Sequence, residues 1–305
     1  MPEATPRRSY GKVFDRVAAE YDRHRPTYPE RLIDLAWEVA GLERGDHVLE
    51  IGCGTGQLTR GLLVRGLRVT AIEPGTRLAE LARQRLAGTG ELELVNARLE
   101  GARLPGERFR AVFSASAMHW VDPDVGWRRM ADALALDGTL ALIQYFGLHQ
   151  PHSADDQRAL LSEMAAIAPE IAEGWPRYRE LEDILAGARE RRENISEVWA
   201  WLGGYEVARG YAAHLFDDAR IAAVPTPTEH TAAELNALLG TMSFWSRLSP
   251  GQRKAMESAN RALCERLGRP IRSSAVACLV SARRRDMPRS PRVASHDATA
   301  AGSDG

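Results

Sequence analysis

Three glycines and one later glutamate are the residues whose types and spacing point most directly to chemistry. Gly52, Gly54 and Gly56 alternate in the stretch HVLEIGCGTGQL, directly after a short apolar run. Glycine lets the backbone turn tightly and lets a ligand approach closely. Glu73 lies 21 residues after Gly52, where an acidic side chain can accept hydrogen bonds from both hydroxyls of a ribose. The spacing predicts a site for an adenosine-containing cofactor.

A second candidate is the stretch SASAMHWVDP, residues 114–123, which places His119 beside Trp120. Histidine is the side chain whose ordinary pKa lies nearest neutrality, so it can take a proton from an acceptor group. Three interpretations of His119 remain open: a general base, a hydrogen-bond donor to a substrate, or a histidine packed in the core. Trp120 is expected to form a wall of the same pocket.

These residues need a scaffold, and residues 47–145 alternate strand and helix signals. Strands separated by helices of about ten residues indicate βαβ units in a mainly parallel, doubly wound α/β sheet. Ligands bind such sheets at the carboxyl ends of the strands. The predicted strands are 47–51, 67–72, 91–95, 109–114 and 139–146, and the predicted helices are 57–64, 76–86 and 124–136.

The alternation of strand and helix signals ends after residue 146. The next residues are rich in Ala, Glu and Arg, which favours helices. Strands are predicted again at 220–224 and 274–282, with helices at 232–239 and 250–267. The expected organisation is an N-terminal helical cap over 1–34, a sheet core over 35–149 and 216–283, and a helical lid or substrate insertion over 150–215. Residues 284–305 contain few apolar residues, which predicts a disordered tail.

Composition narrows the class of protein. The longest apolar runs fall short of the roughly 20 residues of a spanning helix, and the first residues lack a secretory signal, so we expect a cytoplasmic protein. A net charge of −1 gives no general attraction to nucleic acid. Cys53, Cys264 and Cys278 have no metal-binding spacing, and His149 and His152 lack a nearby third ligand, so no metal is predicted.

The glycine pattern separates several nucleotide-binding families. Its third glycine comes one residue too early for the dinucleotide fingerprint, and the GK[ST] ending of a P-loop is absent. As it stands, E-x-G-x-G-x-G resembles the first motif of class I S-adenosylmethionine (SAM)-dependent methyltransferases, with Glu73 at that family's acidic position. The stretches 14–32, 114–123 and 230–250 resemble the small-molecule, trans-aconitate methyltransferase-like (methyltransferase type 11) branch. The resemblance implies the seven-stranded Rossmann-like methyltransferase fold.

The resemblance also implies roles for individual residues. His119 is the catalytic candidate from its own chemistry, with its three interpretations still open. The resemblance places the following residues at the cofactor: Tyr21, Arg25, Glu50, Gly52, Cys53, Gly54, Thr55, Gly56, Gln57, Glu73, Pro74, Leu99, Glu100 and Ser114. It expects the following residues at the substrate: Tyr10, Tyr28, His119, Trp120 and Tyr145.

The resulting functional hypothesis is methyl transfer from SAM to an O, N or C atom of a small molecule, leaving S-adenosylhomocysteine (SAH). The arginine- and alanine-rich composition and the large insertion favour natural-product tailoring. Two alternatives stay open: a SAM-binding enzyme that transfers no methyl group, such as a cyclase, and a nucleic-acid or protein methyltransferase. We expect a monomer or homodimer without a nucleic-acid or membrane partner.

Overall fold

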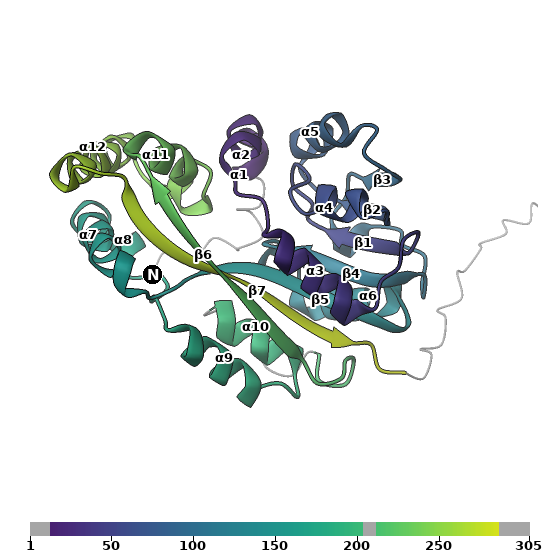
Figure 1. Ribbon diagram of the computed structural model, residues 1–305. Helices are drawn as coiled ribbons and strands as arrows, with labels where there is room; N and C mark the ends of the chain where they lie inside the picture. Colours follow the sequence, from purple (N-terminus) through teal and green to yellow (C-terminus); the bar gives the residue numbers. More distant parts are fainter. Residues whose placement is uncertain (1–12, 204–211, 287–305) are drawn as a thin grey trace, which may run out of the picture.

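In the computed structural model, which describes residues 13–203 and 212–286, a seven-stranded sheet runs through the molecule in the order β3-β2-β1-β4-β5-β7-β6 (Figure 1). β7 is antiparallel to its neighbours β5 and β6, and the other pairs are parallel. The predicted doubly wound, mainly parallel α/β sheet is therefore confirmed. The strands are β1 (His47–Ile51), β2 (Arg68–Ile72), β3 (Leu92–Val95), β4 (Phe109–Ala115), β5 (Leu134–Gly147), β6 (Arg220–His230) and β7 (Ile271–Arg283).

Helices cover both faces of the sheet because the strands are apolar on both sides. Leu32, Leu62 and Leu86 join one core cluster, so α3 (Glu30–Ala40), α4 (Thr59–Val64) and α5 (Thr76–Leu86) cover one face. Trp127 and Trp199 belong to the cluster on the other face. That face is covered by α6 (Pro123–Ala133), α9 (Leu181–Glu190) and α10 (Ile195–Gly203).

A third apolar cluster forms at the far end of β6 and β7, where four helices gather (Figure 1). Met164, Ile171, Leu239 and Met256 each bring one of these helices into the cluster. The helices are α7 (Pro151–Ile167), α8 (Pro169–Ala172), α11 (Ala232–Gly240) and α12 (Pro250–Leu267). The described part of the 150–215 segment contains α7 to α10, which divide between this cluster and the sheet face covered by α9 and α10.

The boundary between α6 and β5 differs from the prediction. The sequence extended the helix to Leu136 and began the strand at 139, whereas the helix ends at Ala133 and Leu134 already pairs with Phe109. Asp137 and Gly138, a pair of residues that favours a turn, lie at a register shift inside the strand, where Asp137 takes a φ of 60°. Burial of Leu134 in the core outweighs the local turn preference.

The last helices follow their local signals closely. Thr231 and Glu234 form a capping box at the start of α11, and Ser249 and Gln252 form another at the start of α12. Such reciprocal bonds satisfy the free N–H groups of the first turn. The predicted range 250–267 for α12 is confirmed.

The C-terminal end of the described chain bears on the predicted disordered tail. Arg284 belongs to the predicted tail, yet it is buried, forms a β-bridge with Phe216 and donates to Glu107 and to the carbonyl of Leu134. Residues 287–305 of that tail lie outside the described residues. Within the described ranges, no helix combines the length and apolarity needed to cross a bilayer.

A buried ion pair anchors α7 to β7 and gives a first prediction. The Asp156 carboxylate is 3% exposed and accepts two hydrogen bonds from Arg269 and one from the N–H of Arg272. The Arg269 guanidinium lowers the pKa of Asp156. The carboxylate therefore stabilises the fold above its unfolded pKa, and the effect is lost as the pH falls through the lowered folded value. We expect Asp156→Asn to reduce the free energy of unfolding at pH 7 by about 3 kcal/mol in urea titrations.

The matched control is Asp155→Asn, since Asp155 is exposed and its ion pair with Arg158 lies at the surface. We expect a change below about 0.5 kcal/mol there. The difference between wild type and Asp156→Asn should shrink below pH 4. Equal effects of the two substitutions, or a difference that does not depend on pH, would contradict this assignment.

Candidate active site

A single large cavity of about 2020 Å³ opens at the carboxyl ends of β1, β2, β4 and β5, as the sheet topology predicts. Its other walls come from α2 (Ala18–His24), residues 175–179, α10, the 3-10 turn η4 (Ser243–Arg247) and the start of β7. A typical ligand pocket measures about 300–1,000 Å³. The cavity therefore has room for two ligands side by side.

The glycine loop forms one wall of this cavity with two of its three glycines. Gly52 has a φ of +71°, and a Cβ there would lie 2.4 Å from the Cβ of Ala117. Gly54 also lines the cavity. Gly56 instead faces α5, where a Cβ would lie 2.7 Å from a methyl of Leu86. Gly52 is therefore required by the close approach of Ala117, and Gly56 by the close approach of α5.

Glu73 lies at the cavity wall directly after β2 and is 6% exposed. One carboxylate oxygen accepts the N–H of Gly54 at 3.0 Å, and the other accepts the N–H of Gly75 at 2.8 Å. Burial raises the pKa of Glu73, and these two N–H groups act in the opposite direction. Each oxygen has a further lone pair, so the carboxylate can also accept from the two hydroxyls of a ribose.

Among the arginines that line the cavity, Arg25 lies directly after α2. It donates to the carbonyl of Thr241 at 2.8 Å, and its guanidinium lies 5.0 Å from the ring centre of Tyr21. Its Nε is buried and has no hydrogen-bond partner among the described residues. A donor left in this state at a cavity wall fits the carboxylate of the expected cofactor.

The remaining predicted cofactor residues divide into two groups. Tyr21, Pro74, Leu99 and Glu100 line the large cavity with Glu73. Six others stand behind the loop and hold its shape: Glu50, Cys53, Thr55, Gly56, Gln57 and Ser114. Among them, Ser114 is fully buried and its hydroxyl donates to the carbonyl of Ile51, which joins β4 to β1.

Glu50 is the most deeply buried acid of the loop. It is 1% exposed, and its carboxylate accepts the hydroxyl of Thr59 at 2.7 Å. Burial raises the pKa of Glu50 to about 7. The residue faces a small neighbouring pocket of about 30 Å³, together with Cys53, Gln57 and Tyr28.

His119 and Trp120 lie together on the 3-10 turn η3 (Met118–Trp120), and both line the cavity. Their ring centres are 4.8 Å apart, and Trp120 meets the ring of Phe14 edge-on at 5.7 Å. Tyr145 lines the cavity as well and stacks on Tyr28 at 5.5 Å.

One of the predicted substrate residues, Tyr28, does not line the large cavity. Tyr28 is buried behind it, and its hydroxyl donates to Ser116 at 2.9 Å. Tyr10 lies outside the described residues.

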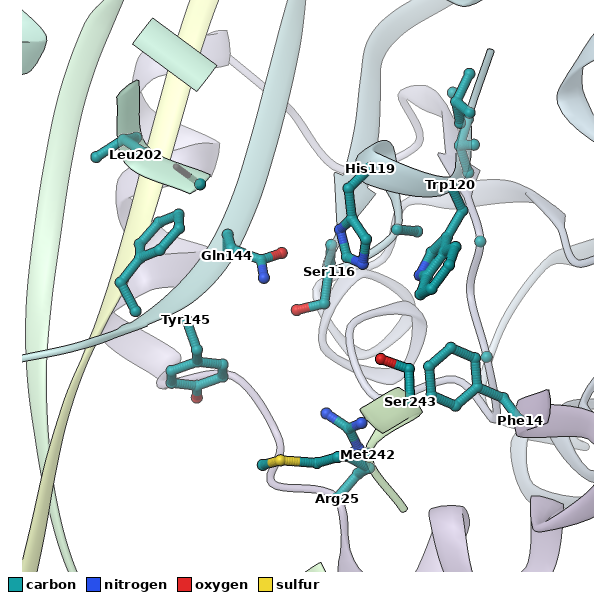
Figure 2. A pocket seen from close by; sticks show the side chains of 18 of the residues that line it. Phe14, Arg25, Ser116, His119, Trp120, Gln144, Tyr145, Leu202, Met242 and Ser243 are labelled. Carbon is teal, nitrogen blue, oxygen red and sulfur yellow. The ribbon is translucent and has the colours of Figure 1, made fainter. Parts of the chain in front are cut away.

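The sequence did not single out several residues that face this space. Figure 2 shows Ser116, His119 and Gln144 converging from β4, η3 and β5, with Arg25 and Met242 on the opposite side. Ser116 takes a φ of 54°, a left-handed conformation that is uncommon for non-glycine residues. A small polar residue after β4 was a usable signal for Ser116. The sequence held no such signal for Met242, because it lies more than 90 residues after Gln144 along the chain.

Comparison with known proteins agrees with this geometry. Residues 48–138 match the family described as a methyltransferase domain. The methyltransferase Rv3342 of Mycobacterium tuberculosis, itself uncharacterised, is 36% identical over 137 residues, which are 45% of this chain and 54% of that protein. The chain thus spans about half the length of this relative.

Solved structures show the same fold at low sequence identity. One such structure is of a protein from Anaeromyxobacter dehalogenans that is described as a type II methyltransferase. It superposes with a TM-score of 0.56 at 22% identity, covering 85% of this chain and 97% of that chain. The YcgJ protein of Bacillus subtilis gives a TM-score of 0.50 at 15% identity, covering 85% of this chain and 100% of its own.

The raised pKa of Glu50 leads to a prediction for the protein without ligand. Because the folded pKa is about 7 and lies above the unfolded value, the folded state is stabilised at low pH, and this stability is lost as the pH rises toward 7. The expected slope is about 1.4 kcal/mol per pH unit. Glu50→Gln removes this slope and should raise the free energy of unfolding above pH 7 relative to wild type.

Urea titrations between pH 5 and pH 8 measure the effect. Glu91→Gln is the control, since Glu91 is exposed and should leave the pH profile unchanged. If Glu50→Gln keeps the wild-type slope, the carboxyl group is already ionised throughout this range and the assignment is wrong.

Proposed function

We propose that this chain, whose residues 48–138 match a methyltransferase domain, transfers the methyl group of S-adenosylmethionine to a small-molecule acceptor. The observation that carries the proposal is one continuous cavity. Glu73 and the glycines of the loop line one part of it, and His119 lines another. Cofactor and acceptor can therefore meet in a single enclosed space.

The cofactor end is assigned from charge and hydrogen-bonding capacity. Glu73 holds the two ribose hydroxyls, because its oxygens are already oriented by two backbone N–H groups. Arg25 and Tyr21 hold the carboxylate of the methionine portion, because the unpartnered Nε of Arg25 supplies a charge-assisted donor. Leu99 and Glu100 border the adenine, as the resemblance implies.

The N-terminal helices close this end of the cavity. The carboxylate of Asp15, on α1 (Val13–Arg16), accepts the N–H groups of Arg77 and Leu78 at the start of α5. Asp22 pairs with Arg85 of the same helix, and Arg25 reaches Thr241 beyond α11. The segment is therefore fixed at both ends across the site, where it keeps water from the reacting atoms.

His119 is proposed to act on the acceptor. The bound cofactor supplies an already activated methyl group, so positioning of the acceptor accounts for much of the rate. A hydroxyl acceptor also requires removal of a proton, which His119 can take at neutral pH. Trp120, held edge-on by Phe14, forms the wall beside it.

The acceptor is proposed to be a small molecule, and natural-product tailoring is the proposed setting. The size of the cavity supports this, because it exceeds the needs of a single cofactor. The non-methylating alternative uses the same cofactor end and differs only in the absence of methyl transfer. Incubation with SAM labelled in its methyl group separates the two, since tight binding without label transfer to any acceptor would favour the alternative.

The assignment of Glu73 is tested by affinity for SAH. Glu73→Ala removes two charge-assisted hydrogen bonds of about 1.5–3 kcal/mol each, so we expect at least a 100-fold loss of affinity in calorimetric titration. Glu91→Ala removes an exposed acid and should leave the affinity unchanged. An unchanged affinity of Glu73→Ala would refute the ribose assignment.

The assignment of His119 is tested by kinetics with a hydroxyl acceptor. His119→Asn is expected to lower kcat roughly 10²- to 10⁴-fold and to remove the histidine step from the pH profile of kcat/KM. With a carboxylate acceptor, which has no proton to lose, kcat should remain unchanged. The control is His214→Asn, since His214 is exposed. A change in KM alone would assign His119 to binding and not to proton transfer.

A further inference from the structure

The part of the cavity that lies beyond Gln144 has an unusual lining. The chain contains 7 Trp, 7 Tyr and 6 Phe, and nine of these aromatic residues line this one cavity. Phe146, Trp175, Tyr178 and Trp201 line it from β5, residues 175–179 and α10. The same segments also contribute charged side chains, namely Arg177, Arg179 and Glu197. Aromatic side chains of this density favour a flat, apolar ligand.

The Trp201 ring is held in place by three neighbours. The guanidinium groups of Arg179 and Arg191 lie 4.8 Å and 4.4 Å from its ring centre, and its indole N–H donates to the carbonyl of Ile184. Gly187 makes room for it, since a Cβ there would lie 2.3 Å from the ring. A glycine inside a helix costs about 0.5–1 kcal/mol relative to alanine, and here the packing of Trp201 uses the space it leaves.

The other rings of this wall are also fixed before any ligand arrives. A Cβ on Gly147 would lie 2.5 Å from the ring of Tyr178, so that ring packs directly on the backbone of β5. Trp175 meets Phe244 edge-on at 5.2 Å. Rings fixed in this way lose little entropy when a ligand binds, which favours a rigid partner over a flexible one.

The polar contribution comes from Gln144, between this wall and His119. The side chain lies among the lining residues, and its Oε1 is buried without a hydrogen-bond partner among the described residues. A half-turn of the terminal torsion exchanges the oxygen and the N–H₂ of a carboxamide, so either end can face a ligand. The N–H₂ can donate to the oxygen of a ligand hydroxyl, which leaves the hydroxyl hydrogen for His119. Figure 2 shows this group beside Ser116 and His119.

We propose that the far part of the cavity is the acceptor subsite and that it takes a flat polycyclic aromatic molecule bearing a hydroxyl group directed at Gln144. The inference rests on the proposed function, since it names the acceptor class of the same site. Trp201, Trp175 and Tyr178 form the walls that hold the ring system. Gln144 is a positioning residue that orients the hydroxyl toward His119.

The test measures binding of 2,6-dihydroxyanthraquinone, whose hydroxyls form no internal hydrogen bond, by calorimetry in the presence of saturating SAH. We expect one site per chain, and at least tenfold weaker binding of n-decanol, which is apolar but flexible. Trp201→Leu and Trp175→Leu should each weaken binding of the anthraquinone at least tenfold without changing the affinity for SAH. Trp37→Leu is the matched control, because Trp37 lies on α3 and does not line the cavity.

A second pair of probes isolates the polar contact. Gln144→Leu should weaken binding of 2,6-dihydroxyanthraquinone at least fivefold and leave binding of unsubstituted anthraquinone unchanged. Unchanged SAH affinity and thermal unfolding in each variant show that the fold is retained. Because Trp175 is partly exposed, its variant keeps the test usable if Trp201→Leu unfolds.

The outcomes separate this inference from the proposed function. If SAH binds but the anthraquinone does not, or if decanol binds equally well, the subsite is wrong while the proposed function stands. Equal losses in Trp37→Leu and Trp201→Leu would also overturn it. If SAH itself fails to bind, the proposed function fails and the acceptor subsite fails with it.

Discussion

The cofactor end of the site depends on one buried carboxylate. Glu73 is buried at the carboxyl end of β2. The free-energy cost of burying its carboxylate is offset by hydrogen bonds from the N–H groups of Gly54 and Gly75. The same two bonds fix the glycine loop relative to the turn before α5. A single acid therefore organises both backbone segments that a nucleoside must contact, and it does so before any ligand binds.

The acceptor end depends on a different constraint, the pairing of β5, β7 and β6. The long antiparallel β7 carries the sheet beyond the cofactor edge, and the helices α7, α8, α11 and α12 pack around its far end. This extension brings Gly147, Tyr178, Trp201 and Met242 to one cavity. Four distant parts of the chain thus share a wall because one strand is long enough to reach them.

Local signals explain which predictions are confirmed. Residues 76–86 and 250–267 form helices because their apolar spacing and, for the latter, the Ser249 cap agree with the fold. The start of β5 was predicted wrongly because core burial of Leu134 overrides the Asp137 turn signal. Gln144 could not be found from sequence, because an amide on an apolar strand shows neither its burial nor its missing partner.

The sequence by itself determined the cofactor half of this protein. The spacing from Gly52 to Glu73 spans one βαβ unit, so a local pattern is enough to bring both residues to the same sheet edge. Only the tertiary structure decided the acceptor half, because its walls come from segments that no local periodicity relates. It also decided that Gly56, Cys53 and Ser114 shape the loop from behind, since which side of a loop faces the ligand depends on what packs on the other side.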